Sequence, residues 1–167
     1  MSTVKTPVTS GADQPSVGFF NQNKDRQAWM GLLARAPKDT LEKIWAELSD
    51  RPEYGLLRAP ETGMVMVRAR AGGEGGRFNL GEMSVTRCVV RTLDGRMGQS
   101  YVAGRDHRHA ELAALFDALM QDPERRIQLK RELLDPVETA IRDKHQEDAQ
   151  KSAATKVDFF TMVRGED

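Results

Sequence analysis

The sequence is poor in the residues from which many catalytic and metal sites are built. Its 167 residues include one cysteine, Cys88, so the chain alone can form no disulfide and no cysteine-based zinc or iron–sulfur site. No apolar run is long enough to span a bilayer, and the first residues lack the apolar stretch of a secretory signal. We therefore expect a cytoplasmic protein with no membrane partner.

An excess of charge of either sign is also missing. Lys+Arg and Asp+Glu both number 25, so the whole chain gives no electrostatic reason to expect nucleic acid as a partner. A chain with so little net charge is weakly protected by electrostatic repulsion against association, and this mildly favours a protein that works as part of a complex.

The familiar catalytic motifs are absent as well. There is no GxSxG, no GxxxxGKS/T loop, and no GxGxxG between a strand and a helix. His109 and Glu111 have the His-x-Glu spacing of zinc deaminases, but those sites need a pair of cysteines that this chain lacks. Cys88 lies among apolar strand residues, where a buried side chain is commoner than a nucleophile. The sequence predicts no metal site and no catalytic site that this chain completes alone.

The clearest pattern that is present covers residues 84–121. Asp94-Gly95 lies between two apolar runs and predicts a β-hairpin with a type I′ turn, since Gly accepts positive φ. The strands of this hairpin are expected over residues 84–93 and 96–104. A helix is expected over residues 107–121, with Asp106 as its cap.

The elements before this hairpin are weaker. Asn23 can cap a first helix that ends at Ala36, and Pro37 suits the first turn of a second helix that ends near Asp50. A strand over residues 54–59 should stop at Pro60, and Gly81 suggests a bulge. Further strand patterns cover residues 64–71 and 77–80.

Helices follow the sheet, and Pro123 and Pro136 each begin one. Beyond residue 141 the last helix is almost wholly polar, as in a helix that is surrounded by solvent or that extends to another protein. We predict an α+β fold with an N-terminal helical hairpin, a mostly antiparallel sheet of about four strands, C-terminal helices and an extended apolar tail. Residues 1–22 should be a disordered tail, residues 23–153 one domain, and residues 154–167 a docking segment.

Arginine dominates the positive charge of the predicted sheet. No lysine occurs between residues 58 and 108, and nine arginines against five acids leave a local excess of four positive charges. Arginine suits bidentate contact with phosphate or carboxylate, although such clusters more often form a solvated face with salt bridges. The loop at residues 104–109 could hold an anion at the helix start, unless Asp106 occupies those N–H groups as the cap.

The end of the chain is unusually apolar. The segment VDFFTMVRG at residues 157–165 follows the polar helix and is costly to expose to water. It could return to its own sheet as an edge strand, or pair with or anchor in a partner.

Four segments together resemble the PhnG family, the G subunits of the bacterial carbon–phosphorus lyase core complex. They are RAPETGMVMVRAR at residues 58–70, TRCVVRTLDGRMGQSYVAGRD at residues 86–106, HAELAALFDALMQ at residues 109–121, and VDFFTMVRG. The resemblance extends from Asp25 onward.

The resemblance implies a subunit that joins PhnH-, PhnI- and PhnJ-like proteins and lies closest to PhnI. With PhnH, PhnI and the ATPase-like PhnL, the family supports transfer of the ribose triphosphate moiety of ATP to methylphosphonate. Adenine leaves, and α-D-ribose 1-methylphosphonate 5-triphosphate forms. PhnI-like subunits would supply the catalytic groups of this transferase, and PhnJ-like subunits use S-adenosylmethionine and an iron–sulfur cluster. No cofactor is expected on this chain alone.

The same resemblance places the candidate site residues in an accessory role. We expect the anion path, or the PhnI-like subunit around it, to be braced by Arg87, Arg91, Arg105, His109 and Glu111. We expect docking on a partner by Phe159, Phe160, Met162, Val163 and Arg164. Two alternatives stay open: a scaffold that takes no part in the active site, and an independent anion-binding module.

Overall fold

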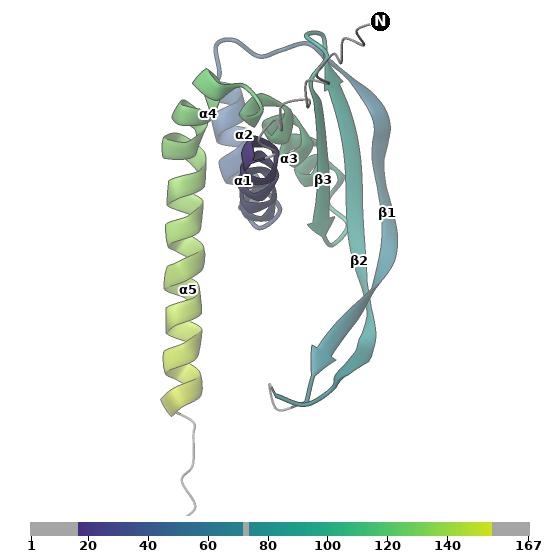
Figure 1. Cartoon of the computed structure of the whole chain (residues 1–167), viewed down its shortest axis with the longest axis vertical. Coiled ribbons are helices and arrows are strands. Elements are labelled where there is room, and N and C mark those ends of the chain that lie inside the picture. Colours follow the sequence, from purple (N-terminus) through teal and green to yellow (C-terminus); the bar gives the residue numbers. More distant parts are fainter. Residues whose placement is uncertain (1–16, 72–73, 155–167) are drawn as a thin grey trace, which may run out of the picture.

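The computed structural model describes residues 17–71 and 74–154 of the chain. An antiparallel sheet forms one layer, α3 packs against it, and the other helices cover the far side of α3 (Figure 1). This confirms the α+β class. The elements, in order, are α1 (Val17–Leu33), α2 (Lys38–Glu47), β1 (Tyr54–Arg70), β2 (Arg77–Thr92), β3 (Met97–Ala103), α3 (His107–Met120), α4 (Pro123–Leu129), the π-helical turn η1 (Lys130–Leu134) and α5 (Asp135–Ala154).

The first helix starts earlier than the sequence predicted. It begins at Val17, so Asn23 lies inside it and is not its cap. Asparagine costs an interior helical position only a fraction of a kcal/mol, on the order of 0.7 at most, so a good cap residue need not mark a boundary. The second helix follows Pro37, close to the predicted start.

The sheet has three strands in the order β1-β2-β3, and not about four. Pro60 does not end β1, because β1 is an edge strand and its pairing with β2 shifts between Arg58 and Glu61. An edge strand with a bulge tolerates a residue that has no N–H to donate. The segments expected at residues 77–80 and 84–93 likewise form one strand. Gly81 lies beside a further register shift, as predicted, since Val67 pairs with Gly81 and Arg68 with Asn79.

The hairpin at Asp94-Gly95 is confirmed, but its turn is not type I′. Gly95 has a φ of 88°, whereas no residue other than glycine in the described ranges has a positive φ. The Gly95 N–H donates to the Thr92 carbonyl at 2.9 Å. Leu93 and Asp94 therefore hold the central positions of the turn, and Gly95 follows in the left-handed conformation, as in three-residue hairpin loops.

Beyond β3 the first two strands continue as a two-stranded ribbon, which we call the arm (residues 64–70 and 77–84). In Figure 1 the arm runs past the lower ends of α1, α2 and α3 on the side opposite α5. Large apolar side chains stay exposed along it, among them Met64, Met66, Phe78 and Leu80. An isolated two-stranded ribbon is marginal in water, so the arm depends on the body and on whatever covers it.

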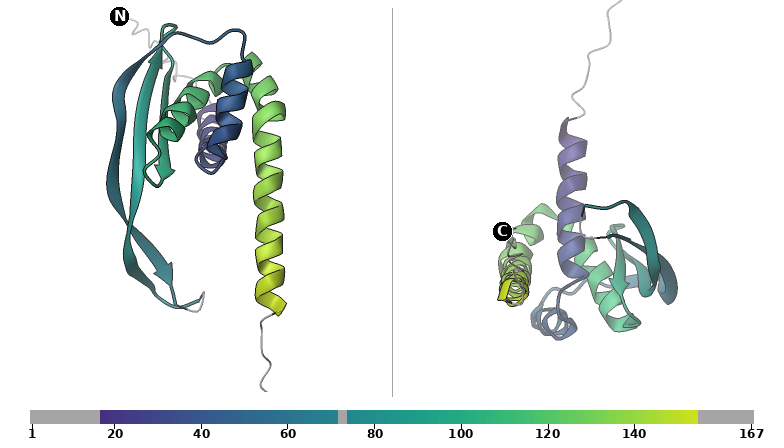
Figure 2. Two further views of the ribbon diagram at one scale, coloured as in Figure 1. Left: turned by 180° about the vertical axis from the view of Figure 1, so that it is seen from behind. Right: turned by 90° about the horizontal axis from the view of Figure 1, so that it is seen from below.

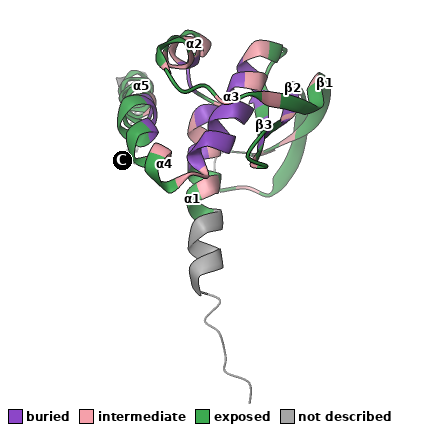
Figure 3. Cartoon of the chain, turned by 90° about the horizontal axis from the view of Figure 1, so that it is seen from above, coloured by how far each residue is buried: buried purple, intermediate pink, exposed green. Residues whose placement is uncertain are grey.

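Helix α3 is the centre of the core, and eleven of its fourteen residues are buried (Figure 3). The sequence AELAALFDALM carries apolar residues on every side, which suits a helix enclosed between a sheet and other helices. Cys88 and Val90 of β2 face it and are fully buried. The predicted burial of Cys88 is thus confirmed, and it raises the pKa of the thiol to about 11.

The C-terminal helices follow one another without a loop. Asp122 caps α4 by accepting from the Glu124 N–H at 2.9 Å, and Pro123 takes the first position, as expected. Pro136 is the second residue of α5, which confirms the predicted helix start to within one residue, and the π-helical turn η1 joins α5 to α4 without a loop. From residue 142 to residue 153 every side chain of α5 is exposed.

The packing of the sheet on α3 requires a glycine at position 98. A Cβ at Gly98 would lie 1.9 Å from the Ala114 carbonyl oxygen and 2.7 Å from the Ala118 nitrogen. Both obstacles are helix backbone, which cannot move aside as a side chain can.

Gly98→Ala should therefore lower the free energy of unfolding by about 3 kcal/mol, because β3 must move away from α3. The midpoint of urea unfolding measures this change. Gly63→Ala is the matched control: it lies in β1 with nothing within 4 Å of its Cβ position, so it should leave the midpoint nearly unchanged. Equal midpoints for the two variants would contradict the close approach.

Candidate functional site

The five residues expected to brace an anion do not form one cluster. Arg87 and Arg91 project from the outer face of the sheet. The even-numbered residues of this part of β2, Thr86, Cys88 and Val90, face the core, and successive side chains of a strand point to opposite faces. The other three are Arg105 in the loop after β3, and His109 and Glu111 on α3. The structure thus divides the predicted set between the sheet surface and the interior.

Arg87 is already paired on the sheet surface. Its Nε donates to Glu61 Oε1 at 2.6 Å, and Arg58 donates to the same oxygen at 3.0 Å. All three side chains are about half exposed, so the pairs contribute little to stability. Two guanidinium groups on one carboxylate still leave a local positive charge. Arg87 also lines a shallow hollow of about 160 Å³ with Tyr101.

Arg91 and Arg105 keep more of their donors available. Within the ranges that the structure describes, Arg91 makes no hydrogen bond or ion pair, and Arg105 makes one long bond, from Nε to Ser84 Oγ at 3.5 Å. Both are exposed. Of the predicted set, these two side chains are the most available to an anion or to an acidic partner.

His109 lies in the interior. Its ring Nε2 is 3.0 Å from the Leu33 carbonyl oxygen, and because a carbonyl only accepts, Nε2 carries the proton. The Leu33 carbonyl belongs to the last turn of α1, where carbonyls lack helical partners. His109 therefore ties α3 to the end of α1.

Glu111 is likewise held by neighbouring residues. Tyr54 donates its hydroxyl to Oε1 at 2.7 Å, and Arg108 donates to Oε2 at 2.9 Å. Burial, and then the bond to Glu111, raise the pKa of Tyr54, so the phenol stays protonated at neutral pH. The carboxylate thus joins β1 to α3.

The loop before α3 has the geometry of a cap. Asp106 Oδ1 accepts from the His109 N–H at 2.9 Å, and this bond lowers the pKa of the Asp106 carboxyl. The helix start that could hold an anion is thereby occupied by the chain's own carboxylate, which confirms Asp106 as the cap.

A chain of hydroxyl groups fixes this loop to the sheet. Thr86 donates to the Gly104 carbonyl at 2.8 Å, so the hydroxyl of Thr62, 3.0 Å away, must donate to Thr86. Thr62 then accepts from His107 Nε2 at 3.2 Å. The sequence did not predict this contact, because Thr62 and His107 are 45 residues apart along the chain.

Asp117 is a buried carboxylate that sequence reasoning missed. Its side chain is fully buried and accepts four bonds: two from Arg26 (Nε 3.1 Å, Nη2 2.7 Å), one from Trp29 Nε1 (2.9 Å) and one from the Gln99 backbone N–H (2.9 Å). An aspartate inside the apolar run ALFDALM was the available signal. Its network is structural, since every donor comes from the protein itself.

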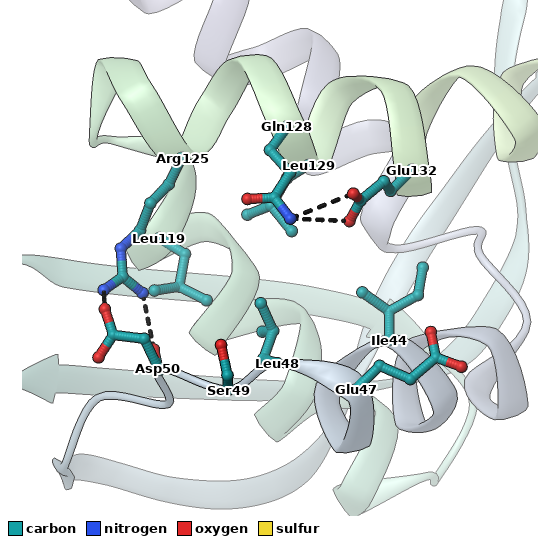
Figure 4. A pocket seen from close by; sticks show the side chains of 10 residues that line it. All are labelled: Ile44, Glu47, Leu48, Ser49, Asp50, Leu119, Arg125, Gln128, Leu129 and Glu132. Carbon is teal, nitrogen blue, oxygen red and sulfur yellow. Dashed lines mark hydrogen bonds and ion pairs between the residues drawn. The ribbon is translucent and has the colours of Figure 1, made fainter.

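Two hollows lined by described residues lie beside the C-terminal helices. One of about 210 Å³ lies between the end of α2 and α4, where Arg125 pairs with Asp50 (Figure 4). Another, of about 340 Å³, lies beside Trp29, over which the Arg126 guanidinium stacks at 5.0 Å. In the described ranges, no three His, Cys, Asp or Glu residues gather as metal ligands.

The expectations about a membrane span and about the docking residues can be compared only with the residues that the structure describes. Among these residues no helix has both the length and the apolarity to cross a membrane. The predicted docking residues lie outside them: Phe159, Phe160, Met162, Val163 and Arg164.

Comparison with known proteins gives a consistent result. The model of the family described as phosphonate metabolism protein PhnG matches residues 24–165. The chain is 45% identical over 142 residues to the alpha-D-ribose 1-methylphosphonate 5-triphosphate synthase subunit PhnG of Rhizobium meliloti (strain 1021). That alignment covers 85% of this chain and 90% of the relative.

Asp117→Asn should destabilise the protein by about 3 kcal/mol, because an amide cannot accept all four bonds and Arg26 loses its counter-charge. Chemical unfolding at neutral pH measures the loss. Asp143→Asn, the same change at an exposed position of α5, should stay within about 0.5 kcal/mol of the parent. A mild effect at Asp117 would show that the network contributes little.

The Asp106 cap should be visible in the pH dependence of stability. A carboxyl whose pKa is lower in the folded state stabilises the protein above its unfolded pKa of about 3.9, and this contribution is lost as pH falls through the folded value. Asp106→Asn keeps a capping acceptor but does not titrate. Its stability deficit at pH 7 should shrink as the pH falls below about 4.

Asp106→Ala serves as the comparison, because its side chain has no acceptor for the helix N–H groups. It should remain less stable than Asp106→Asn both at pH 7 and below about pH 4. Thermal unfolding across this range gives the result. A deficit of Asp106→Asn that is the same at every pH would rule out a contribution from the ionised cap.

Proposed function

The chain belongs to the PhnG family of phosphonate metabolism proteins, and on this premise we propose that it is an accessory subunit of an α-D-ribose 1-methylphosphonate 5-triphosphate synthase. The observation that carries the proposal is the 45% identity, over most of both chains, to a relative that bears this name. The partners we propose are PhnH-, PhnI- and PhnJ-like subunits and a PhnL-like ATPase family protein, with the PhnI-like subunit closest.

The proposed reaction joins methylphosphonate to the ribose of ATP. A phosphonate oxygen forms a bond to the ribose C1′ as the bond from C1′ to adenine breaks, and the electron pair leaves with the base. Both reactants are anionic, so fixed cationic donors that hold them together lower the barrier. ATP is a substrate of the complex, and S-adenosylmethionine and an iron–sulfur cluster serve another subunit.

The geometry supports an accessory role for this chain. Its candidate proton-transfer groups, Glu111 and His109, are engaged inside the fold. Its exposed candidates are arginines, which attract anions but do not exchange protons at neutral pH. We propose that Arg91 and Arg105 brace the anion path or the PhnI-like subunit around it, with Arg87 beside them.

A scaffold without any part in the active site is the second candidate. It is favoured by the pairing of Arg87 with Glu61 and by the internal bonds of His109 and Glu111. The two candidates differ in whether loss of an exposed arginine affects turnover while assembly stays intact.

Co-expression with the partner subunits tests the proposal. Each complex is sized, and adenine release from ATP plus methylphosphonate is measured with and without this chain. We expect a stoichiometric complex that releases adenine only when the chain is present. A chain that stays monomeric and leaves the partners' activity unchanged would refute the subunit role.

Arg91→Ala and Arg105→Ala then separate bracing from scaffolding. Loss of one charge-assisted contact should slow adenine release by about tenfold or more in an intact complex. Arg142→Ala, an exposed arginine of α5, is the matched control and should not slow it. Full turnover with both sheet variants would leave the scaffold as the better account.

A further inference from the structure

Among the residues that the structure describes, no strand lies beside β1 on the side away from β2. β1 is an edge strand, and from residue 61 to residue 66 every side chain on it is exposed. We call residues 61–68 of β1 the open edge. Long apolar edges of this kind recruit other strands, so folded proteins cover or charge them.

The backbone groups that point away from β2 along the open edge can be identified. The Ser84 carbonyl of β2 accepts a hydrogen bond from the Gly104 N–H, which follows β3. The Leu93 N–H, just after the end of β2, donates to the Glu53 carbonyl, which precedes β1. Even-numbered residues of β2 therefore bond toward β3, and odd-numbered ones bond toward β1. Val85 pairs with Gly63 and Met83 with Val65.

It follows that Thr62, Met64 and Met66, which alternate with these residues, direct their N–H and C=O groups to the free side of β1. The side chains between Glu61 and Arg68, the two ends of the open edge, are uncharged. Glu61 is already paired with two arginines, so the free charge of the edge is that of Arg68. Arg68 has no hydrogen bond or ion pair with any residue that the structure describes. A fitting strand would be apolar and would place an acid opposite Arg68.

We propose that residues 157–164 of the same chain are this strand, and that they pair antiparallel with the open edge. The segment reads VDFFTMVR, with an acid near its start and a base at its end. The proposal takes the alternative in which this segment returns to its own sheet, in place of docking on a partner, and does not depend on the reaction of the complex.

The position of α5 supports this occupant. α5 ends at Ala154 at the same end of the molecule as the tip of the arm (Figures 1 and 2). Near that tip the twist of the arm brings β1 to the side that faces α5, in both views. Residues 155–157 can extend the chain by about 10 Å beyond the end of α5. We propose that the chain enters the open edge from the tip of the arm. A segment that enters there and runs toward the body is antiparallel to β1.

The charges select the same direction. With Met162 opposite Met64 and Phe160 opposite Met66, Asp158 lies opposite Arg68, and Arg164 lies next to Glu61. A parallel strand would instead place Arg164 beside Arg68, where like charges repel. The opposite charges of Asp158 and Arg68 thus favour the antiparallel direction and this register.

Paired cysteines test this register in the full-length chain with Cys88→Ala. Val65→Cys and Thr161→Cys would face each other in a non-bonded pair, with Cα atoms about 4.5 Å apart, which a disulfide can bridge. We expect a cross-link within one chain under mild oxidation. Val65→Cys with Met162→Cys is the matched control, since those side chains would lie on opposite faces of the sheet and should not cross-link.

Charge reversal provides a second test that does not depend on cysteines. The amides of Thr62, Met64 and Met66 should exchange hydrogen at least about tenfold more slowly in the parent chain than in Asp158→Arg. Combining Asp158→Arg with Arg68→Asp should restore the protection. Equal exchange in all three proteins would overturn the proposal.

The origin of the strand is decided by mixing. A disulfide between one chain carrying Val65→Cys and another carrying Thr161→Cys would show that a second copy supplies the strand, and would overturn the proposal. Protection of the edge amides that arises only after a PhnI-like partner is added would overturn it as well. Intramolecular cross-linking at all concentrations, with rescue by the reversed charge pair, would establish it.

Discussion

The buried carboxylate of Asp117 is the interaction on which the body of this protein depends. Helix α3 is enclosed on all sides, so a charge on it must find its partners within the protein. Arg26 and Trp29 supply them from α1, and the Gln99 N–H supplies one from β3. One side chain thus holds the first helix, the central helix and one edge of the sheet in a fixed arrangement.

That arrangement also determines which edge of the sheet stays open. The Gln99 N–H points away from β2, where it would otherwise be free to pair with another strand, but Asp117 accepts it. Arg26 and Gln121 both donate to the neighbouring Met97 carbonyl. The β3 edge is therefore partly closed by α1 and α3. β1, which extends beyond these helices into the arm, has no comparable cover among the described residues.

The features predicted correctly from sequence are those that local chemistry decides. Asp106 as a cap, the Asp94-Gly95 hairpin and the buried helix after it each rest on neighbouring residues. The continuity of β1 through Pro60 was not predictable in this way, because it depends on β1 being an edge strand with shifted pairing. The roles of His109 and Glu111 depend on Leu33 and Tyr54, which are 76 and 57 residues away along the chain. A pattern of residue types carries no information about such contacts.

The division between engaged and available side chains limits what this chain can contribute to a transferase. A group that moves a proton must reach the reacting atoms and change its protonation near neutral pH. Glu111 and His109 are bonded inside the fold, Tyr54 is held protonated, and the Cys88 thiol is buried. Arg91 and Arg105 remain exposed, and a guanidinium keeps its charge at any physiological pH. Such groups can hold an anion or a partner's carboxylate in place, and this is the accessory role that we propose for the chain.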